Sequence, residues 1–353
     1  MADWAQSYGV SYEFWEVDAD TFEDSRRLYG IEECEITRDS DDPTLGDATM
    51  TVEEYFPSES YIRVYLMVEQ PAGSGNVERI CLATLLAQVA EHRMDGKVVQ
   101  RPLELSTPLK ELDDDNPPEG YTIKKGADAV AAATRIFSRF HVKVKKCGIS
   151  KAMPRDVTAN DSDTWLTFGR AVLEAVNMEP TLDPSGYVGF APISDASALS
   201  PIWYFVDDDI SILNPELTLQ QDWHEIPNTV EVKVSTSNSG VRAECVNSDP
   251  SSPVSTVVRG RTVRRRVDNP EGVATKEQAE AYAYRELKKL SCSENEVTYS
   301  HGYCPVALGH CVGIYYTEHS LDIKAKVVRQ VIRCSTDLEV SETSRYTEAL
   351  WNG

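Results

Sequence analysis

A run of acidic residues followed by two prolines interrupts the first half of the chain. This run reads Glu111-Leu112-Asp113-Asp114-Asp115-Asn116-Pro117-Pro118-Glu119-Gly120. Like charges repel one another and proline lacks an amide hydrogen, so such a segment neither continues a helix nor forms a central strand. We therefore predict a linker over residues 113–125. It separates an N-terminal domain, residues 1–112, from the rest of a chain whose 353 residues allow two or three domains.

The N-terminal domain has the pattern of short strands. Residues 11–17 alternate aromatic and polar side chains, and residues 61–68 are rich in the β-branched and aromatic residues that suit a pleated sheet. The segment 80–90 is ambiguous, because its apolar residues also have helical spacing. We therefore predict a mainly β domain and leave the structure of 80–90 open.

The middle domain, residues 126–222, has a different pattern. Residues 127–140 are rich in alanine and place apolar side chains along one side of a helix. The side chains of Asp161–Asp163 suit the N-cap of a second helix. A turn sequence at 183–186 lies between apolar stretches and predicts a hairpin. This domain is therefore predicted to contain both helices and strands.

Strands return in the C-terminal domain, residues 223–353, around one helix predicted over 275–291. Thr275 is a good N-cap for that helix, and Gln278 completes a capping box three residues later. The predicted strands cover residues 229–234, 255–263, 296–300, 312–316 and 323–333. The chain is thus predicted to be α+β and mainly β, with two sheet-rich domains flanking a smaller α/β middle region.

The chain is strongly acidic, with 57 Asp and Glu, 35 Lys and Arg and a net charge of −22. A protein that binds duplexes through their phosphates should be basic, so the charge argues against general nucleic-acid affinity. No stretch of about 18 apolar residues is present to span a membrane, and the N-terminus lacks the features of a secretory signal. The cysteines form no CxxC pair and indicate reduced thiols in a protein made in the cytoplasm: Cys34, Cys81, Cys147, Cys245, Cys292, Cys304, Cys311 and Cys334.

A group of histidines and cysteines offers the best candidate for a metal site: His301, Cys304, His310 and Cys311. It contains no Cys-x-x-Cys pair, and the apolar residues around it are typical of two strands joined by a turn. We therefore interpret these residues as buried side chains of a sheet. The sequence also lacks a phosphate-binding loop, a nucleophile elbow and a His-Glu-x-x-His helix. We predict no catalytic residues, no cofactor-binding residues and no metal ligands.

Three acidic clusters, at residues 39–42, 161–163 and 207–209, place carboxylates close together in the sequence. The first two lack the glycine and the closing glutamate of an EF-hand calcium loop. The third follows aromatic residues which, with one further tryptophan, would suit a sugar-binding site: Trp203, Tyr204, Phe205 and Trp223. We favour solvated turns for the clusters and core packing for the aromatic residues.

Five arginines form the one basic feature: Arg259, Arg261, Arg264, Arg265 and Arg266. They lack interleaved aromatic residues, which weakens the case for a nucleic-acid patch. Guanidinium groups suit bidentate pairing with carboxylates of a neighbouring subunit, and an exposed strand face explains the cluster about as well. Asn160-Asp161-Ser162 matches a glycosylation sequon, which has no meaning without a secretion signal.

Five short segments, distributed over nearly the whole chain, form a recognisable series: Ile36–Ser40, Glu59–Leu66, Tyr121–Ala127, Ile226–Val232 and Pro305–Val312. Taken in this order, they resemble the baseplate or tail-tip hub proteins of tailed bacteriophages. In the last segment, the Pro-x-x-x-Gly-Asp-x-Val motif of that family is matched with His310 in place of the aspartate.

The resemblance implies a structural virion protein at the distal tail tip. The first and last domains would be β-barrel-like hub domains, so a homotrimer would form a pseudo-sixfold ring around the passage for tape measure and DNA. Implied partners are further copies of the chain, the distal tail or tail-tube protein, the tape measure protein and tail fibre or receptor-binding proteins. Genomic double-stranded DNA would contact the ring only in transit. The resemblance further implies no stable membrane insertion and no cofactor. No enzymatic activity is expected, since the chain ends after the hub region.

Two other classes of function stay open from the residues alone. One is an enzyme whose middle-domain carboxylates act on cell-wall glycan. The other is a carbohydrate-binding module that uses the aromatic residues around β-strand 203–205 and Trp223. Three hub chains at −22 each would carry −66, so we expect a ring whose acidic side chains repel DNA and let it slide through.

Overall fold

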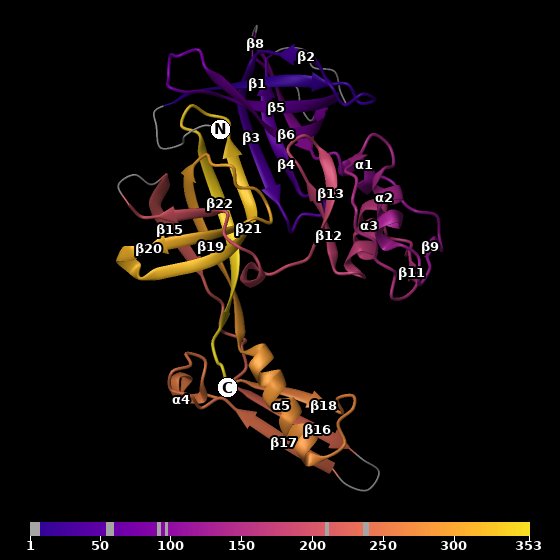
Figure 1. Ribbon diagram of the computed structural model, residues 1–353, viewed down its shortest axis with the longest axis vertical. Coiled ribbons are helices and arrows are strands. Elements are labelled where there is room, and N and C mark those ends of the chain that lie inside the picture. Colours follow the sequence, from indigo (N-terminus) through magenta and orange to yellow (C-terminus); the bar gives the residue numbers. More distant parts are fainter. Residues whose placement is uncertain (1–7, 54–59, 90–92, 96–97, 209–211, 236–239) are drawn as a thin grey trace.

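The structure, a computed structural model, describes residues 8–53, 60–89, 93–95, 98–208, 212–235 and 240–353. Strands dominate it and a few helices complete an α+β fold, as the sequence predicts. Most of the molecule lies together at one end, and a smaller part projects from it (Figure 1). No helix within the described ranges is long and apolar enough to cross a membrane.

An antiparallel sheet formed by the first part of the chain makes up what we name the N-terminal module. Its strand β5 buries Ile62, Val64 and Leu66 completely, because alternate residues of a strand face the same side. The ambiguous segment 80–90 falls almost entirely within strand β6, where Leu82 and Leu85 face the same core. The strands are β1 Gly9–Val17, β2 Asp24–Leu28, β3 Ile31–Asp39, β4 Gly46–Val52, β5 Ser60–Glu69, β6 Val77–Val89, β7 Arg93–Asp95 and β8 Val98–Ser106.

A second group of strands forms the C-terminal module. The strands predicted at 296–300, 312–316 and 323–333 are the inner parts of β19, β20 and β21, whereas β22 was not predicted. Strands β14 and β15 precede the predicted boundary at residue 223 but pair with β20 and β19 in this module. The strands are β14 Trp203–Val206, β15 Leu213–Gln220, β19 Cys292–Gly302, β20 Cys311–Tyr316, β21 Leu321–Arg333 and β22 Glu339–Ala349.

The two modules share one sheet. Strand β3 of the N-terminal module pairs antiparallel with β21 of the C-terminal module, from Glu35 opposite Arg333 to Asp39 opposite Arg329. The result is a continuous fourteen-stranded sheet in which residues almost 300 positions apart in the sequence are hydrogen-bonded neighbours. The modules therefore lie side by side as one unit (Figure 1).

The middle region packs beside the N-terminal module and contains the two predicted helices. Asp128 caps the first of them, and Thr164 caps the second, with its hydroxyl accepting from the Thr167 amide at 3.2 Å. The predicted cap at Asp161–Asp163 is therefore wrong by one to three residues. The elements are α1 Lys110–Asp113, β9 Thr122–Ile123, α2 Ala129–Phe137, β10 Lys143–Val144, β11 Val157–Thr158, α3 Trp165–Glu174, and the predicted hairpin as β12 Met178–Leu182 and β13 Tyr187–Pro192.

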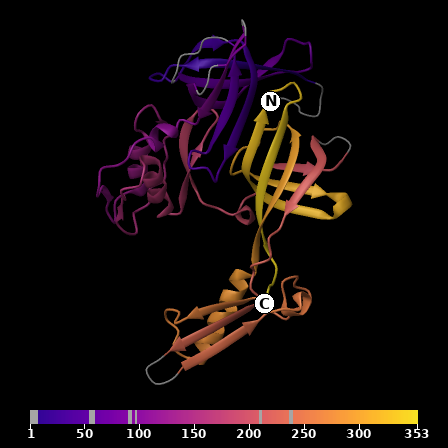
Figure 2. The ribbon, with the colours of Figure 1, turned by 180° about the vertical axis from the view of Figure 1, so that it is seen from behind.

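The projecting module, residues 223–291, is inserted between β15 and β19. Its three-stranded sheet carries helix α5, whose Ala279, Ala283 and Leu287 bury one face of β16. The capping box of Thr275 and Gln278 is present as predicted. The elements are β16 Thr229–Ser235, β17 Gly240–Val246, α4 Thr256–Arg259, β18 Arg264–Asp268 and α5 Lys276–Leu290. The chain enters and leaves this module through one narrow neck (Figure 2).

The strand predicted at 255–263 is wrong. Ser255 caps the short helix α4 by accepting from the Val258 amide at 3.2 Å, and Gly260 ends it with a left-handed φ of 62°. The serine cap and the glycine stop override the β-propensity of the intervening valines. The arginines that follow then form β18.

Candidate functional site

The junction between the two sheet modules is held by a side-chain network that begins at Arg38. This residue lies on β3 opposite Gln330 of β21. Its guanidinium donates to Gln330 Oε1 at 2.9 Å and to the carbonyl of Leu82, on β6, at 2.6 Å. One arginine thus ties the two modules across the shared strand pair.

The network continues into the core of the C-terminal module at Glu342, which has no exposed surface. Its carboxylate accepts hydrogen bonds from Tyr299 Oη at 2.8 Å and from Gln330 Nε2, and it lies 3.4 Å from His301 Nε2. Burial alone would raise the pKa of Glu342, but the contacts with His301, Gln330 and Tyr299 outweigh it and hold this pKa below its usual value. The carboxylate therefore stays ionised inside the sheet at neutral pH.

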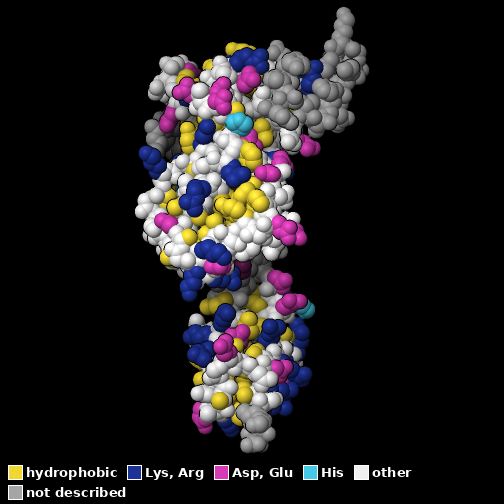
Figure 3. All heavy atoms as spheres, turned by 90° about the vertical axis from the view of Figure 1, so that its right-hand side faces the viewer, with side chains coloured by type: hydrophobic (Ala, Val, Ile, Leu, Met, Phe, Trp, Pro, Cys, Tyr) yellow, Lys and Arg dark blue, Asp and Glu magenta, His cyan; other side chains and the backbone are white. Residues whose placement is uncertain are grey.

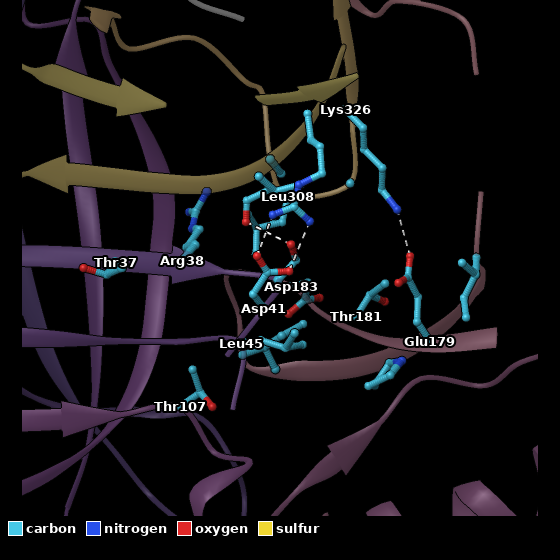
Figure 4. A pocket seen from close by; sticks show the side chains of 18 of the residues that line it. Thr37, Arg38, Asp41, Leu45, Thr107, Glu179, Thr181, Asp183, Leu308 and Lys326 are labelled. Carbon is cyan, nitrogen blue, oxygen red and sulfur yellow. Dashed lines mark hydrogen bonds and ion pairs between the residues drawn. The ribbon is translucent and has the colours of Figure 1, made fainter. Parts of the chain in front are cut away.

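A cavity of about 340 Å³ lies where the N-terminal module, the middle region and the C-terminal module meet (Figure 4). Arg345 of β22 forms a bidentate pair with Asp41, at 2.7 and 3.3 Å, across its wall. Lys326 of β21 pairs with Glu179 of β12 at 3.1 Å on another side. These pairs connect parts of the chain that are distant in sequence, so the cavity marks the point on which all three parts converge.

The β12–β13 turn docks the middle region on the N-terminal module. The carbonyl of Pro184 accepts from Thr84 Oγ1 at 3.1 Å, and that of Ser185 accepts from Arg63 Nη2 at 3.3 Å. Gly186 has a φ of 85°, and a Cβ there would lie 2.9 Å from the Phe22 ring. Only glycine therefore fits both the turn and the close approach. The predicted turn is thus also a docking element, which its sequence did not indicate.

Two arginines of the predicted cluster, Arg264 and Arg266, pair with a carboxylate of their own chain. Glu231 of β16 is completely buried, and it contacts Arg264 at 3.2 Å and Arg266 at 3.3 Å on the adjacent strand. Arg242 approaches it at 2.6 Å from β17. Desolvation opposes the charge of Glu231, but Arg264 and the other cations hold its pKa below the usual value. Arg259 instead donates to the carbonyl of Ile226 at 2.7 Å.

Charge is divided unequally among the parts of the chain. The projecting module, residues 223–291, holds 11 Lys and Arg against nine Asp and Glu, for a net charge of +2. Residues 1–112 hold nine Lys and Arg against 23 Asp and Glu, for a net charge of −14. Many of the basic side chains of the projecting module are visible in Figure 3. The acidity thus belongs mostly to the N-terminal domain.

The four candidate metal ligands are not brought together. His301 Nδ1 lies 2.6 Å from the carbonyl of Gly302 and 3.8 Å from Cys304 Sγ. His310 Nδ1 accepts from the Ala307 amide at 3.1 Å, while Cys311 Sγ contacts the carbonyl of Ala196 at 3.8 Å. Within the described part of the chain, no three His, Cys, Asp or Glu side chains are arranged to hold a metal ion. These side chains are packed within the sheet and contact neighbouring backbone groups.

The acidic clusters lie in or beside turns, and their carboxylates pair with basic side chains or backbone amides. In the first, Asp39 pairs with Arg329 at 3.6 Å, and Asp41 with Arg345. In the second, Asp163 accepts from the Asn160 amide at 2.7 Å. In the third, Asp207 accepts from the Thr317 amide at 2.7 Å, and Asp209 lies outside the described residues. The three clusters are distributed over separate parts of the fold.

The aromatic residues of β14 are divided between its two faces. Phe205 is buried, with ring centroids 5.1 Å from Tyr299 and 4.5 Å from His301. Tyr204 is 54% exposed and lies against Tyr315 at 5.8 Å. Core packing is therefore confirmed for Phe205, and the set does not form one continuous aromatic surface.

The sequence analysis did not identify Glu342 and Glu231 as buried residues, because a glutamate in a strand normally faces solvent. Their burial follows from the strands that pair with theirs, β21 for Glu342 and β18 for Glu231. The arginines of β18 offered a weak signal, for which pairing with another subunit and an exposed strand face were both considered.

Solved structures of tail proteins share this fold. The tail protein from Neisseria meningitidis MC58 matches with a TM-score of 0.61 and 13% identity, over 96% of each chain. The 43 kDa tail protein of prophage MuSo2 from Shewanella oneidensis gives a TM-score of 0.62 and 13% identity, over 96% of this chain and 98% of that one. A chain of the half-lidded Francisella PdpA-VgrG complex gives 0.54 and 10% identity, over 99% of this chain and 59% of that one.

The resemblance found in the sequence is therefore confirmed at the level of the fold, which this chain shares with the two tail proteins and with a chain of the PdpA-VgrG complex. No protein-family model and no curated protein sequence matches the chain. The similarity is thus carried by the arrangement of strands and modules, and very little by the identity of residues.

Proposed function

We propose that this chain is a structural subunit of a phage tail, and that three copies form the hub that closes its distal end. The observation that carries the proposal is the fused pair of sheet modules, joined through β3 and β21, in a fold that matches two tail proteins almost from end to end. Two modules side by side in each chain supply six modules in a trimer. Six modules match the symmetry of a sixfold tail tube.

The strand edges support contacts between copies. Within the described residues, the path of the shared sheet runs from β2, which pairs with β1, to β15, which pairs with β19. Each of these edge strands leaves backbone donors and acceptors on its outer side, and such edges readily accept another strand. A closed ring would cover edges of this kind, as cyclic assemblies do with complementary surfaces.

The proposed partners follow from the position in the tail. The ring would contact the tail-tube or distal tail protein above it, and the tape measure protein and DNA would leave through its centre. Tail fibre or receptor-binding proteins would attach outside. The role is architectural, so we expect no clearing zone when the protein is tested on peptidoglycan gels.

The mass of the protein in solution tests the proposal. A trimer of the 39.3 kDa chain, seen by light scattering and as three-lobed rings in negative stain, is the expected result, either alone or after mixing with tail-tube protein. A chain that stays monomeric under both conditions, or rings with another number of lobes, would contradict it. A clearing zone on peptidoglycan would instead support the enzyme hypothesis.

We infer further that the acidic N-terminal domain helps DNA to pass. Residues 1–112 carry a net charge of −14, and carboxylates lining a passage repel phosphates at close range. Replacing passage-lining Asp and Glu by Lys should slow DNA ejection from virions. Ejection at the original rate in such virions would show that the charge does not act on DNA.

A further inference from the structure

Two cysteines from opposite ends of the chain face each other at the junction of the modules. Strands β3 and β21 are antiparallel, with Glu35 opposite Arg333, so the next pair along them is Cys34 and Cys334. The amide of Cys334 donates to the carbonyl of Cys34 at 2.9 Å. Directly opposed residues in an antiparallel pair project from the same side of the sheet.

The backbone spacing at this pair suits a disulfide. Hydrogen-bonded pairs of antiparallel strands have Cα atoms about 5.5 Å apart. Disulfides span Cα separations of roughly 4.4–6.8 Å. The register therefore places the two thiols next to each other, and a small adjustment of the strands brings the sulfur atoms within bonding reach.

The two thiols differ in their access to solvent. Cys34 is buried in the core of the N-terminal module, and Cys334 packs against that core but is only partly buried. The hydrogen bond to Cys334 and burial together hold the pKa of the Cys34 thiol well above its usual value. The other buried thiols contact different partners, His301 for Cys304 and the carbonyl of Ala196 for Cys311.

We propose that Cys34 and Cys334 are a redox-active pair that closes to a disulfide and covalently links the N-terminal and C-terminal modules. The oxidant is a small disulfide such as oxidised glutathione. The Cys334 thiolate attacks one sulfur of that molecule, its S–S bond breaks, and one glutathione thiolate leaves. The Cys34 thiolate then attacks Cys334 Sγ in the mixed disulfide and releases the second glutathione. Two protein thiols are oxidised, and one glutathione disulfide is reduced to two thiols.

The pair is reduced where the chain is made and meets oxidising conditions after release of the particle. That setting rests on the proposed function, whereas the pairing of the cysteines rests only on the strand register. The bond closes a loop between residues 34 and 334 and holds β3 against β21. It therefore prevents the two modules from separating.

Peptide mapping of the purified full-length chain tests the proposal. After incubation with oxidised glutathione and alkylation without reduction, mass spectrometry should find a peptide that links Cys34 to Cys334. The thermal midpoint should rise by roughly 5 °C or more and return to its first value on reduction. The second exchange step should accelerate as pH rises, because it needs the Cys34 thiolate.

Matched variants separate the pair from general thiol oxidation. Cys334→Ser and Cys34→Ala should give neither the linked peptide nor the shift in midpoint. Cys292→Ser, which changes an exposed cysteine, should retain both. A wild-type chain that gains only a glutathione adduct at Cys334, or that remains unmodified, would overturn the proposal.

A second measurement on virions keeps this inference distinct from the proposed function. The disulfide could form in the purified chain but be absent from released particles. That result would refute oxidation after release of the particle, and the cysteine pair itself would remain established. A trimeric hub without the linked peptide in either sample would refute the pair alone.

Discussion

Replacing the buried carboxylate of Glu342 should weaken the C-terminal module strongly. In Glu342→Leu the side chains of His301, Tyr299 and Gln330 lose their shared acceptor. Removing one partner from a buried charged network generally costs about 3–5 kcal/mol of unfolding free energy. Tyr299 keeps a contact with Ser344 at 3.0 Å, and Gln330 keeps a carbonyl acceptor at 3.1 Å. We therefore expect the lower part of that range, about 3 kcal/mol.

Glu342→Gln keeps the shape of the side chain but removes its charge. Each hydrogen bond then changes from a charged to a neutral acceptor, a difference of about 1 kcal/mol per bond. With two donors and the nearby imidazole, the expected loss is about 2–3 kcal/mol at pH 7. Urea unfolding monitored by circular dichroism measures both losses. Glu35→Gln is the control, because its ion pair with Arg333 is largely exposed and should change stability by less than about 0.5 kcal/mol.

The pH dependence supplies the decisive comparison for Glu342. Its folded pKa lies below the ordinary value of 4.5, so its ionised form stabilises the fold above pH 4.5. That contribution is lost as the pH falls through the folded pKa. Wild type should therefore lose stability below pH 4.5 more steeply than Glu342→Gln. Equal unfolding free energies at pH 7, or parallel pH profiles, would refute the view that a buried carboxylate anion organises the junction.

Three further substitutions probe other parts of the fold. Gly169→Ala places a Cβ 2.7 Å from the Phe137 ring between α3 and α2. It should lower the unfolding free energy, measured in urea, by about 1–3 kcal/mol. Gly148→Ala, which has open space around it, is the control and should leave the unfolding free energy unchanged. Thr275→Ala removes the cap of α5 and should lower stability by about 1 kcal/mol, with faster amide exchange in the first turn of α5. Glu231→Leu leaves its arginines facing one another. It should lower the thermal midpoint of the projecting module, and added salt should restore part of the loss by screening the repulsion.

Local signals in the sequence were sufficient to predict the three longer helices, α2, α3 and α5, but not the short helices α1 and α4. The capping box of Thr275 and Gln278 placed α5 to within one residue at each end, since capping and side-chain periodicity act within a few residues. The strand predicted at 255–263 failed because β-propensity was weighed above a serine cap and a glycine stop. The segment 80–90 was undecidable because apolar residues fit either period, and its neighbours in the sheet determined the outcome.

The junction itself could not be predicted from the sequence. Pairing of Cys34 with Cys334, or Arg38 with Gln330, depends on a register between strands almost 300 residues apart. A strand pattern specifies which residues share a face but not which strand lies beside it. The family resemblance supplied the order of the modules, and the register came only from the structure.

The rigidity of this junction matters for the proposed ring because errors in its angle accumulate. In a trimer, the angle between the two modules of one chain is repeated three times, so a small change in each copy opens or overcloses the whole circle. A single strand pair would leave that angle free to twist, since adjacent strands vary widely in their mutual rotation. Arg38 and the facing cysteines join β3 directly to β21, and Glu342 of β22 holds Gln330, the residue that Arg38 contacts. These contacts restrict the twist of the strand pair, and a closed ring most needs a defined geometry at this junction.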